Sequence, residues 1–190
     1  MTIYLTSDTH FGHAGVLAMC DRPFADVAAM DEGLISIWNS VVGRKDTVWH
    51  LGDFALGPKG TAERVFRRLN GSKHLIVGNH DGDDVKRCAW ASVHDMASQR
   101  VDGVKLVLCH YPMLSWPGSS YNGQHHVSGQ PATVTSIMCH GHVHGTPSNS
   151  RLPHQDAFRI DVGVDMQSMA PVAAEAVVAG VRATMRAGSL

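Results

Sequence analysis

Short apolar runs that end in histidine, aspartate or asparagine recur along this 190-residue chain, and they constrain its fold more than any other feature. Apolar runs of this length are typical of buried β-strands. The five runs, each with the polar residues that follow it, are Ile3 to Ser7 with Asp8-Thr9-His10, Thr47 to Leu51 with Gly52-Asp53, His74 to Val77 with Gly78-Asn79-His80-Asp81, Val104 to Cys109 with His110, and Thr135 to Cys139 with His140-Gly141-His142-Val143-His144. In layered α/β folds ligands bind at the carboxyl ends of strands. The pattern therefore predicts an α/β fold with a site at these strand ends.

Helical patterns separate the predicted strands. From Asp26 to Val42 apolar residues recur at helical spacing, and Asp26 is suited to cap the helix. Further helices are predicted over Thr61 to Asn70 and Pro171 to Arg186, and a further strand over Phe158 to Val164. A chain of 190 residues with 44% apolar residues suits one domain, so we expect a single domain over residues 1–190.

The residues at the strand ends form a candidate ligand set for metal ions. Asp8 and His10 are two residues apart, as are His142 and His144, and in extended backbone this spacing puts both side chains on one face. Asp53 follows a glycine, which leaves room for backbone to approach an ion. The full set is Asp8, His10, Asp53, Asn79, His110, His142 and His144. These nitrogen and oxygen donors, with no thiolate, suit Mn²⁺, Fe or Zn²⁺.

Seven ligands are too many for one four-coordinate ion, and they are too few to complete the coordination of two ions. Two ions that share a bridging carboxylate, with positions left for water and substrate, account for the number. Two-metal hydrolytic sites hold their ions about 3.5–4 Å apart, and a water bound to both ions is acidified into a nucleophile. We therefore predict two divalent ions per chain, with Mn²⁺ first and Fe, Zn²⁺, Ni²⁺ or Mg²⁺ as alternatives.

The ordered motifs Asp8-x-His10, Gly52-Asp53, Gly78-Asn79-His80-Asp81, His110 and Gly141-His142-x-His144 resemble those of the calcineurin-like metallophosphoesterase superfamily. The resemblance implies a sandwich of two β-sheets flanked by helices. It also implies that one ion is held by Asp8, His10, Asp53 and His144, and the other by Asp53, Asn79, His110 and His142. A metal-activated water would then be the nucleophile, and His80 would protonate the leaving group.

The second motif departs from one branch of this superfamily. Protein phosphatases extend it as Gly-Asp-x-x-Asp-Arg-Gly, whereas this chain has Gly52-Asp53-Phe54-Ala55-Leu56-Gly57. This chain lacks the extra aspartate and arginine at these positions. His80 therefore has no aspartate partner from this motif, and the substrate phosphate has no arginine from it to bind. The chain is more similar to the small single-domain bacterial and phage-type members, and we disfavour a protein Ser/Thr phosphatase.

Three residues are candidates for binding the substrate phosphate. Asn79 would do so beside its metal, and His13 lies three residues past His10, where the alternative is a plain loop histidine. Arg22 has the planar donor geometry of a phosphate clamp, with a surface salt bridge as its alternative. His125 and His126 lie in the long segment after His110 and are weaker candidates for lining the pocket.

Three acidic residues near the motifs have less certain roles. Asp81 is more suited to stabilising a turn than to orienting His80, because adjacent side chains usually point apart. Asp161 and Asp165 are either supports for metal ligands or plain strand-end acids, and the sequence leaves both open.

Net charge limits the classes of partner. The formal net charge is −1, so the chain as a whole lacks the basic character of nucleic-acid binders. We expect a small phosphodiester or phosphomonoester as substrate. A nuclease or nucleotide pyrophosphatase acting through the same site is the alternative, and a catalytically silent protein-binding scaffold is a third possibility from another class. All seven ligands and His80 are present, which disfavours the scaffold.

Cysteine usage and the chain start indicate the compartment. The four cysteines form no CxxC pair, which argues against a cysteine zinc site. The start of the chain lacks a basic segment followed by a long apolar one, and no run reaches the length of a membrane span. A cytoplasmic location without membrane contact is therefore expected.

Overall fold

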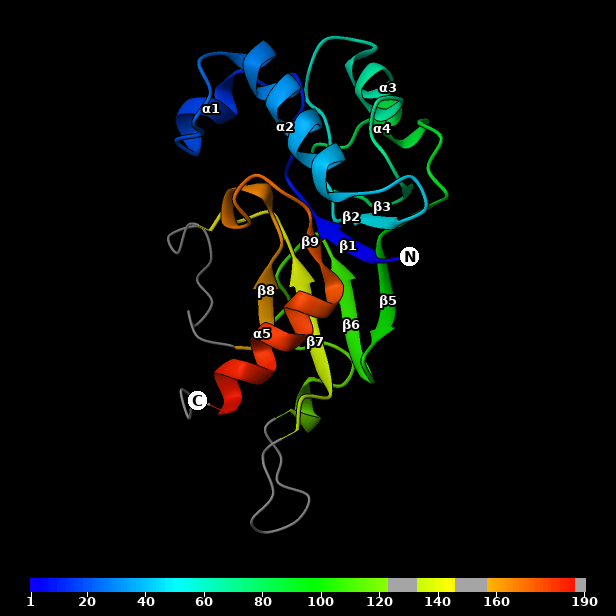
Figure 1. Ribbon diagram of the computed structural model, residues 1–190, viewed down its shortest axis with the longest axis vertical. Coiled ribbons are helices and arrows are strands. Elements are labelled where there is room, and N and C mark those ends of the chain that lie inside the picture. Colours follow the sequence, from blue (N-terminus) through cyan, green and yellow to red (C-terminus); the bar gives the residue numbers. More distant parts are fainter. Residues whose placement is uncertain (123–132, 146–156, 187–190) are drawn as a thin grey trace.

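Two mixed β-sheets form the framework of the computed structural model, which describes residues 1–122, 133–145 and 157–186 (Figure 1). The first sheet has the strand order β4-β3-β2-β1-β9 and the second has the order β5-β6-β7-β8. The strands are β1 (Ile3–Thr6), β2 (Thr47–His50), β3 (Ser72–Ile76), β4 (Ser92–His94), β5 (Met96–Val101), β6 (Val104–Cys109), β7 (Ser136–His140), β8 (Arg159–Asp161) and β9 (Val172–Ala173).

Helices α1 to α4 lie in the upper half of Figure 1, with the first sheet. Their bounds are α1 (Gly15–Met19), α2 (Val27–Val41), α3 (Thr61–Phe66) and α4 (Asp83–Lys86). Helix α2 starts where the sequence predicts, because the Asp26 side chain accepts a hydrogen bond of 2.8 Å from the backbone N–H of Ala29. Its buried face, with Met30, Leu34 and Trp38, packs on the sheet in a core shared with α3 and α4.

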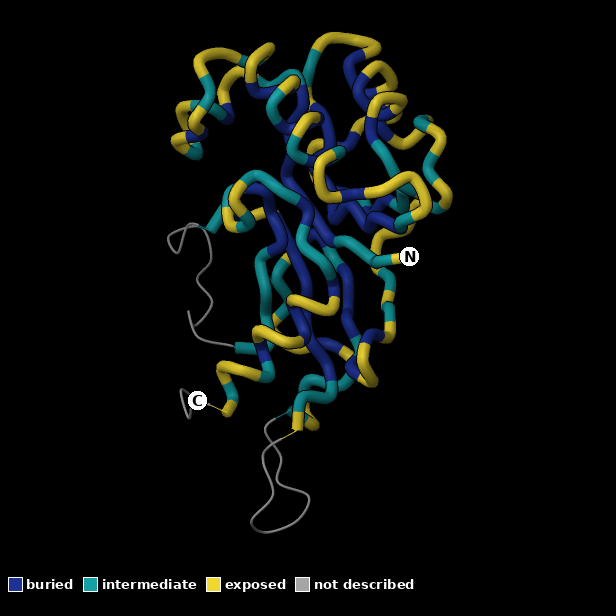
Figure 2. The backbone as a smooth tube through the Cα atoms, viewed as in Figure 1, coloured by how far each residue is buried: buried dark blue, intermediate teal, exposed yellow. Residues whose placement is uncertain are grey.

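A second core joins the two sheets. Leu5 and Trp49 from the first sheet pack with Leu106 and Ile137 from the second, and all four are buried. Figure 2 shows the backbone of the inner strands in the dark blue of buried residues. Helix α5 (Ala174–Arg186) adds Val177 and two further valines to this core. Burial of each large apolar side chain contributes roughly 1.5–3 kcal/mol. The fold is thus an α/β arrangement of two sheets with helices, as the sequence predicts.

Some elements differ from the predicted ones. Strand β5 and the three-residue β4 were not predicted, because β5 is an edge strand with few buried residues and β4 is too short for a pattern. Residues Val172–Ala173 were predicted to start the last helix, but they pair antiparallel with Tyr4 and Leu5 as β9. Helix α3 ends at Phe66, earlier than predicted, and the short helices α1 and α4 were also not predicted.

The carboxyl ends of the two sheets meet. Strands β1, β2 and β3 are parallel to one another, as are β6, β7 and β8, so each set ends along one edge. An isolated parallel bridge joins Ser7 to Gly163, and the Val164 N–H donates to the Ser7 carbonyl at 3.1 Å. The loops that follow both sets of strands are therefore neighbours. None of the described helices combines the length and apolar character needed to cross a bilayer.

Candidate metal centre

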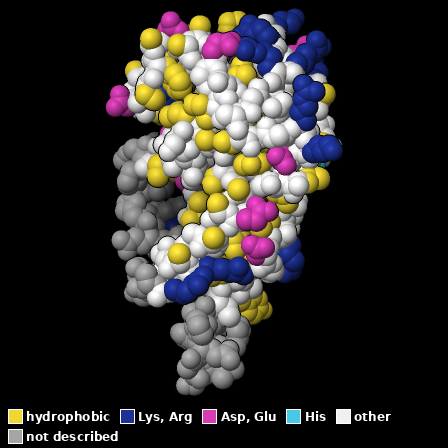
Figure 3. All heavy atoms as spheres, in the orientation of Figure 1, with side chains coloured by type: hydrophobic (Ala, Val, Ile, Leu, Met, Phe, Trp, Pro, Cys, Tyr) yellow, Lys and Arg dark blue, Asp and Glu magenta, His cyan; other side chains and the backbone are white. Residues whose placement is uncertain are grey.

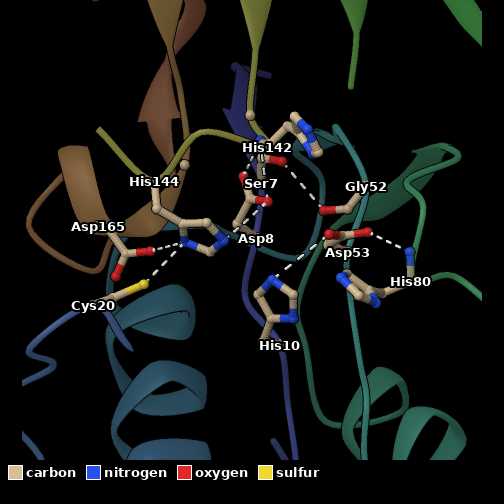
Figure 4. A network of polar contacts seen from close by, with 12 residues as sticks. Ser7, Asp8, His10, Cys20, Gly52, Asp53, His80, His142, His144 and Asp165 are labelled. Carbon is tan, nitrogen blue, oxygen red and sulfur yellow. Dashed lines mark hydrogen bonds and ion pairs between the residues drawn. The ribbon is translucent and has the colours of Figure 1, made fainter. Parts of the chain in front are cut away.

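The first cluster of predicted ligands consists of Asp8, His10 and His144 (Figure 4). Asp8 and His10 follow β1, and His144 follows β7 in the other sheet. Asp8 and His10 are 0% and 3% exposed, and His144 Nε2 lies 3.8 Å from Asp8 Oδ1. The His10 and His144 rings stack with centroids 5.2 Å apart. One donor atom from each residue can reach a common ion, since these atoms lie within 4.8 Å of one another.

The second cluster lies around Asp53, which follows β2. Asp53 Oδ2 lies 3.6 Å from His110 Nε2 and 3.7 Å from His10 Nε2, so this carboxylate faces both clusters. His110 Nε2 is 3.0 Å from the side-chain oxygen of Asn79, and its ring centroid is 5.1 Å from that of His142. Asn79 and His142 are exposed, whereas Asp53 and His110 are buried. The structure thus brings all seven predicted ligands to one place.

Five of these ligands have left-handed backbone conformations, with positive φ. They are Asp8 (56°), His10 (50°), Asp53 (58°), His142 (72°) and His144 (47°). The expectation that extended backbone aligns each pair of ligands two residues apart is therefore wrong. Left-handed backbone costs an ordinary residue roughly 1–2 kcal/mol, although aspartate and histidine tolerate it better than most. The ligands converge because tight turns follow the strands, and the surrounding packing holds these turns in place.

Glycines make room for ligand side chains rather than for an ion. A Cβ atom at Gly52, whose φ is +95°, would lie 2.6 Å from His110 Nδ1. A Cβ atom at Gly141 would collide with Ser7 Oγ and Asp8 Oδ2. We predicted that the glycine before Asp53 lets the backbone approach an ion. The structure shows instead that Gly52 leaves room for the His110 ring.

Arg22 is not free to bind a phosphate. Its side chain is fully buried, and Nε and one terminal nitrogen bind the Asp165 carboxylate at 2.8 and 2.9 Å. The remaining donors reach the carbonyl oxygens of Asp8 and Thr9 at 2.6 and 2.9 Å. The prediction that Arg22 clamps the substrate phosphate is therefore wrong. The alternative, that Arg22 forms a salt bridge, is correct, although this salt bridge is buried and not at the surface.

Asp165 supports a predicted ligand directly. Its Oδ2 lies 2.7 Å from His144 Nδ1, which leaves Nε2 of that ring to face Asp8. The Cys20 thiol lies 3.3 Å from the same Nδ1. An outer carboxylate of this kind fixes the tautomer and orientation of a metal-binding histidine. From the sequence, Asp165 could be either a support for a metal ligand or a plain strand-end acid. A contact between residues 21 positions apart leaves no local signal that would decide between these roles.

The three residues of the Asn79-His80-Asp81 motif have separate roles. The His80 side chain is exposed, and its backbone N–H donates to Asp53 Oδ1 at 2.8 Å. The ring centroids of His80 and His13 each lie 5.6 Å from the ring centroid of His10. Asp81 accepts three backbone hydrogen bonds of 2.8–2.9 Å, from Gly78, Asp53 and Phe54. Asp81 thus stabilises the turn that carries Asp53 and does not orient His80. His125 and His126 lie outside the described residues.

The electrostatics of the first cluster fit a bound cation. Burial raises the pKa of the Asp8 carboxyl to about 7, an effect that the His144 imidazole offsets only in part. Burial, helped by the charges of His144 and Arg22, lowers the pKa of His10 to about 2. Both ring nitrogens of His10 are buried without a hydrogen-bond partner among the described residues. Unpaired buried donors or acceptors are costly, and a divalent ion would pair with this neutral imidazole and stabilise the Asp8 carboxylate.

Two parallel-strand edges bring carboxylate, imidazole and amide donors around a common point, and such a donor set suits a metal-dependent hydrolase. The family comparison gives the substrate bond: the model of the calcineurin-like phosphoesterase superfamily domain matches residues 1–163. The chain belongs to the calcineurin-like phosphoesterase superfamily and is a phosphoric ester hydrolase. The family implies divalent metal ions, and the described residues contain ligand groups for them.

The chain is also similar to individual proteins from archaea, phages and bacteria. An uncharacterized protein of Methanocaldococcus jannaschii, MJ1445, is 37% identical over 134 residues, which cover 66% of this chain and 70% of that protein. The Gene 66 protein of Mycobacterium phage L5 is 32% identical over 184 residues, or 85% of this chain and 86% of the phage protein. The crystal structure of AQ665, a protein of unknown function from Aquifex aeolicus, aligns with a TM-score of 0.67 and 21% identity. It covers 94% of this chain and 98% of that one, and it supports the fold.

Proposed function

We propose that this protein hydrolyses small phosphodiesters or phosphomonoesters at a centre of two divalent ions, with Mn²⁺ as the preferred metal and His80 as general acid. The observation that carries the proposal is the position of Asp53, whose Oδ2 lies 3.6–3.7 Å from an imidazole nitrogen of each cluster. A carboxylate placed in this way is suited to bridge two ions. The absence of a thiolate ligand among the seven favours Mn²⁺ over a metal that prefers sulfur.

The ligands divide between two ions. Asp8, His10 and His144 would hold one, Asn79, His110 and His142 the other, and Asp53 both. When bound, such ions acidify water into a nucleophile and stabilise the attacking and leaving oxygens. The side chains of Asn79 and His13 lie at this centre and are proposed to contact the substrate phosphate. Arg22 holds the turn at Asp8 and Thr9 from behind, through its two carbonyl contacts.

The position of His80 supports its proposed role as proton donor. Its backbone is tied to Asp53 Oδ1, while its side chain is exposed to solvent beside the centre. An alkoxide is a poor leaving group, so proton donation to the leaving oxygen typically accelerates the reaction by about 10²–10⁴-fold. His80 is absent from the proposed ligands, so its removal should leave the metals bound.

The test compares two leaving groups in His80→Ala. With an alkyl phosphodiester, kcat/KM should fall by about 10²–10⁴-fold, because the departing alkoxide needs the proton. With bis-p-nitrophenyl phosphate, whose leaving group is a stabilised anion, the loss should be much smaller. His94→Ala, an exposed histidine in β4, is the matched control and should change neither value. Metal content is measured in each protein.

An equal loss for both esters, at unchanged metal content and with chemistry rate-limiting, would reject His80 as the acid. The donor would then be sought first at His13. No turnover of either ester, nor of p-nitrophenyl phosphate, in the Mn²⁺-loaded wild-type protein would reject small phosphate esters as substrates.

A further inference from the structure

Positive charge is concentrated in one segment of the chain. Residues 44–87 contain nine of the sixteen Lys and Arg residues but only six of the seventeen Asp and Glu residues. Two of those six acids, Asp53 and Asp81, are buried at the candidate metal centre. Figure 3 shows the Lys and Arg side chains gathered in the upper right, over the corner that α3 and α4 form in Figure 1. The net charge of −1 therefore conceals a local basic surface.

Several of these cations have no acidic partner. Arg67 pairs with Glu63, Arg68 with Glu32, and Arg87 with Asp83. In contrast, the exposed side chains of Lys59, Arg64 and Lys86 form no ion pair or side-chain hydrogen bond with another described residue. Surface cations without partners keep their charge available for an external anion. We call Lys59, Arg64 and Lys86, together with the paired Arg68 and Arg87, the basic face.

Part of the basic face lines a cavity next to the metal centre. The cavity has a volume of about 400 Å³ and lies between α2 and α3. Its charged lining consists of the cations Lys59, Arg64 and Arg68 and the acids Asp31 and Glu32, and Gly12 also lines it. Gly12 lies between His10 and His13, and its N–H donates to the carboxylate of Asp31 at the cavity wall. Helix α4, which carries Lys86, begins three residues after His80. The loop after β1, which carries Gly12, and the loop after β3, which carries His80, thus connect the basic face to the centre.

An aromatic side chain lies at the opposite side of the centre. Tyr111 directly follows His110 and is 46% exposed. Its ring centroid is 4.9 Å from that of His142 and 5.0 Å from that of His110. Proteins bind single-stranded nucleic acids by combining exposed aromatic rings with cations, because bases stack on the rings while the cations follow the phosphates. Here a strand that crosses the centre would meet cations on one side and the Tyr111 ring on the other.

We infer that the substrate class of this centre is single-stranded nucleic acid, whose phosphates lie along the basic face and one of whose bases stacks on Tyr111. The inference rests on the proposed phosphodiester hydrolysis and extends its substrate from small esters to a polymeric phosphodiester. An anionic membrane is the other polyanion that a basic face can bind, but such surfaces also insert apolar side chains. Within residues 44–87 only Leu56 is a large exposed apolar residue, at 38%. The charge pattern without apolar residues favours nucleic acid.

The test measures binding separately from catalysis. The triple variant Lys59→Gln, Arg64→Gln, Lys86→Gln is compared with Arg100→Gln, Lys105→Gln, Arg186→Gln, which removes the same charge from the half that contains the second sheet. Fluorescence anisotropy of a labelled single-stranded oligonucleotide is followed at several salt concentrations. The Mn²⁺-loaded protein carries His80→Ala, and the oligonucleotide is shown to be intact afterwards. The first triple should weaken binding on the order of tenfold and lower the salt slope by about 2. Tyr111→Ala should weaken it about fivefold, and Tyr111→Phe should not.

Turnover then separates this inference from the proposed function. In proteins that retain His80, the first triple should lower kcat/KM for the oligonucleotide and leave hydrolysis of bis-p-nitrophenyl phosphate unchanged. Equal oligonucleotide binding by both triples would overturn the inference even if the small ester is hydrolysed. Binding of phosphatidylserine vesicles that depends on the basic face, without oligonucleotide binding, would also overturn it. Failure to hydrolyse any ester, with the binding pattern retained, would instead reject the proposed function.

Discussion

The two ligand clusters share Asp53 but are built differently. Around Asp8 and His10 the side chains are buried, and Arg22 and Asp165 hold the turn and the ligand His144 from behind. Around His110 the outer ligands Asn79 and His142 are exposed. The first cluster is preorganised by the fold, whereas the second is open on the side where a substrate would enter. We infer that the first site binds its ion more tightly, and that the second is more sensitive to the substrate.

The largest effect is expected from the carboxylate that the clusters share. Asp53→Asn should weaken both metal sites together and lower kcat/KM by about 10³-fold, since several kcal/mol of charge stabilisation would be lost. The asparagine oxygen can still accept the His80 N–H, so the turn should persist. Asn79→Ala is the control and should weaken mainly the second site. Metal stoichiometry by elemental analysis decides, and loss of the same single ion in both variants would contradict the bridging role.

The next largest effect, on the metal affinity of the first site, is expected from Asp165, whose carboxylate contacts His144. Asp165→Asn should weaken the first site by about 10–100-fold, because an amide does not hold the His144 ring as a carboxylate does. The second site should keep its affinity. Cys20→Ala is the matched control, because its sulfur contacts the same ring nitrogen at 3.3 Å without an ionic interaction. Calorimetric titration with Mn²⁺ measures both sites. A similar loss in the two variants would mean that packing around His144, and not the carboxylate, matters.

The smallest effect concerns pH. Burial raises the pKa of Asp8 to about 7, so below this pH the carboxyl keeps a proton that a metal ion must displace. The affinity of the first site should therefore fall about fivefold between pH 7 and pH 6 and change little above pH 8. Asn79→Ala should keep this dependence, because Asn79 belongs to the other cluster. Titrations of Mn²⁺ at pH 6, 7 and 8 measure it, and a flat profile would show that Asp8 is already ionised without metal.

The sequence predicts well which side chains converge at the candidate centre, and it predicts poorly which residues support them. Asp8, Asp53 and His110 could be named because each ends a run that reads as a buried strand, and parallel strands bring their ends together. Arg22 and Asp165 could not be paired, since their contact spans 143 residues and neither lies in a recognisable motif.

Backbone detail was equally hidden. The spacing of His142 and His144 suggested extended chain, but turn conformation is set by tertiary contacts such as the close approach of Gly141 to Asp8. Strand β5 was missed because its exposed edge lacks an apolar pattern. The expectations of a single domain over residues 1–190, and of a cytoplasmic location, stay predictions.

The left-handed turns also limit how this family member can change by mutation. At Asp8, Asp53 and His142 the backbone conformation accepts glycine, asparagine, aspartate and histidine far more readily than branched residues. A lineage that no longer needed the metals would therefore drift along a narrow set of replacements, chiefly to asparagine and glycine, before the turns themselves were lost. Catalytic decay in such a lineage should be visible as ligand-to-asparagine changes while the fold persists. A valine or isoleucine at these positions would indicate that the loop had been rebuilt.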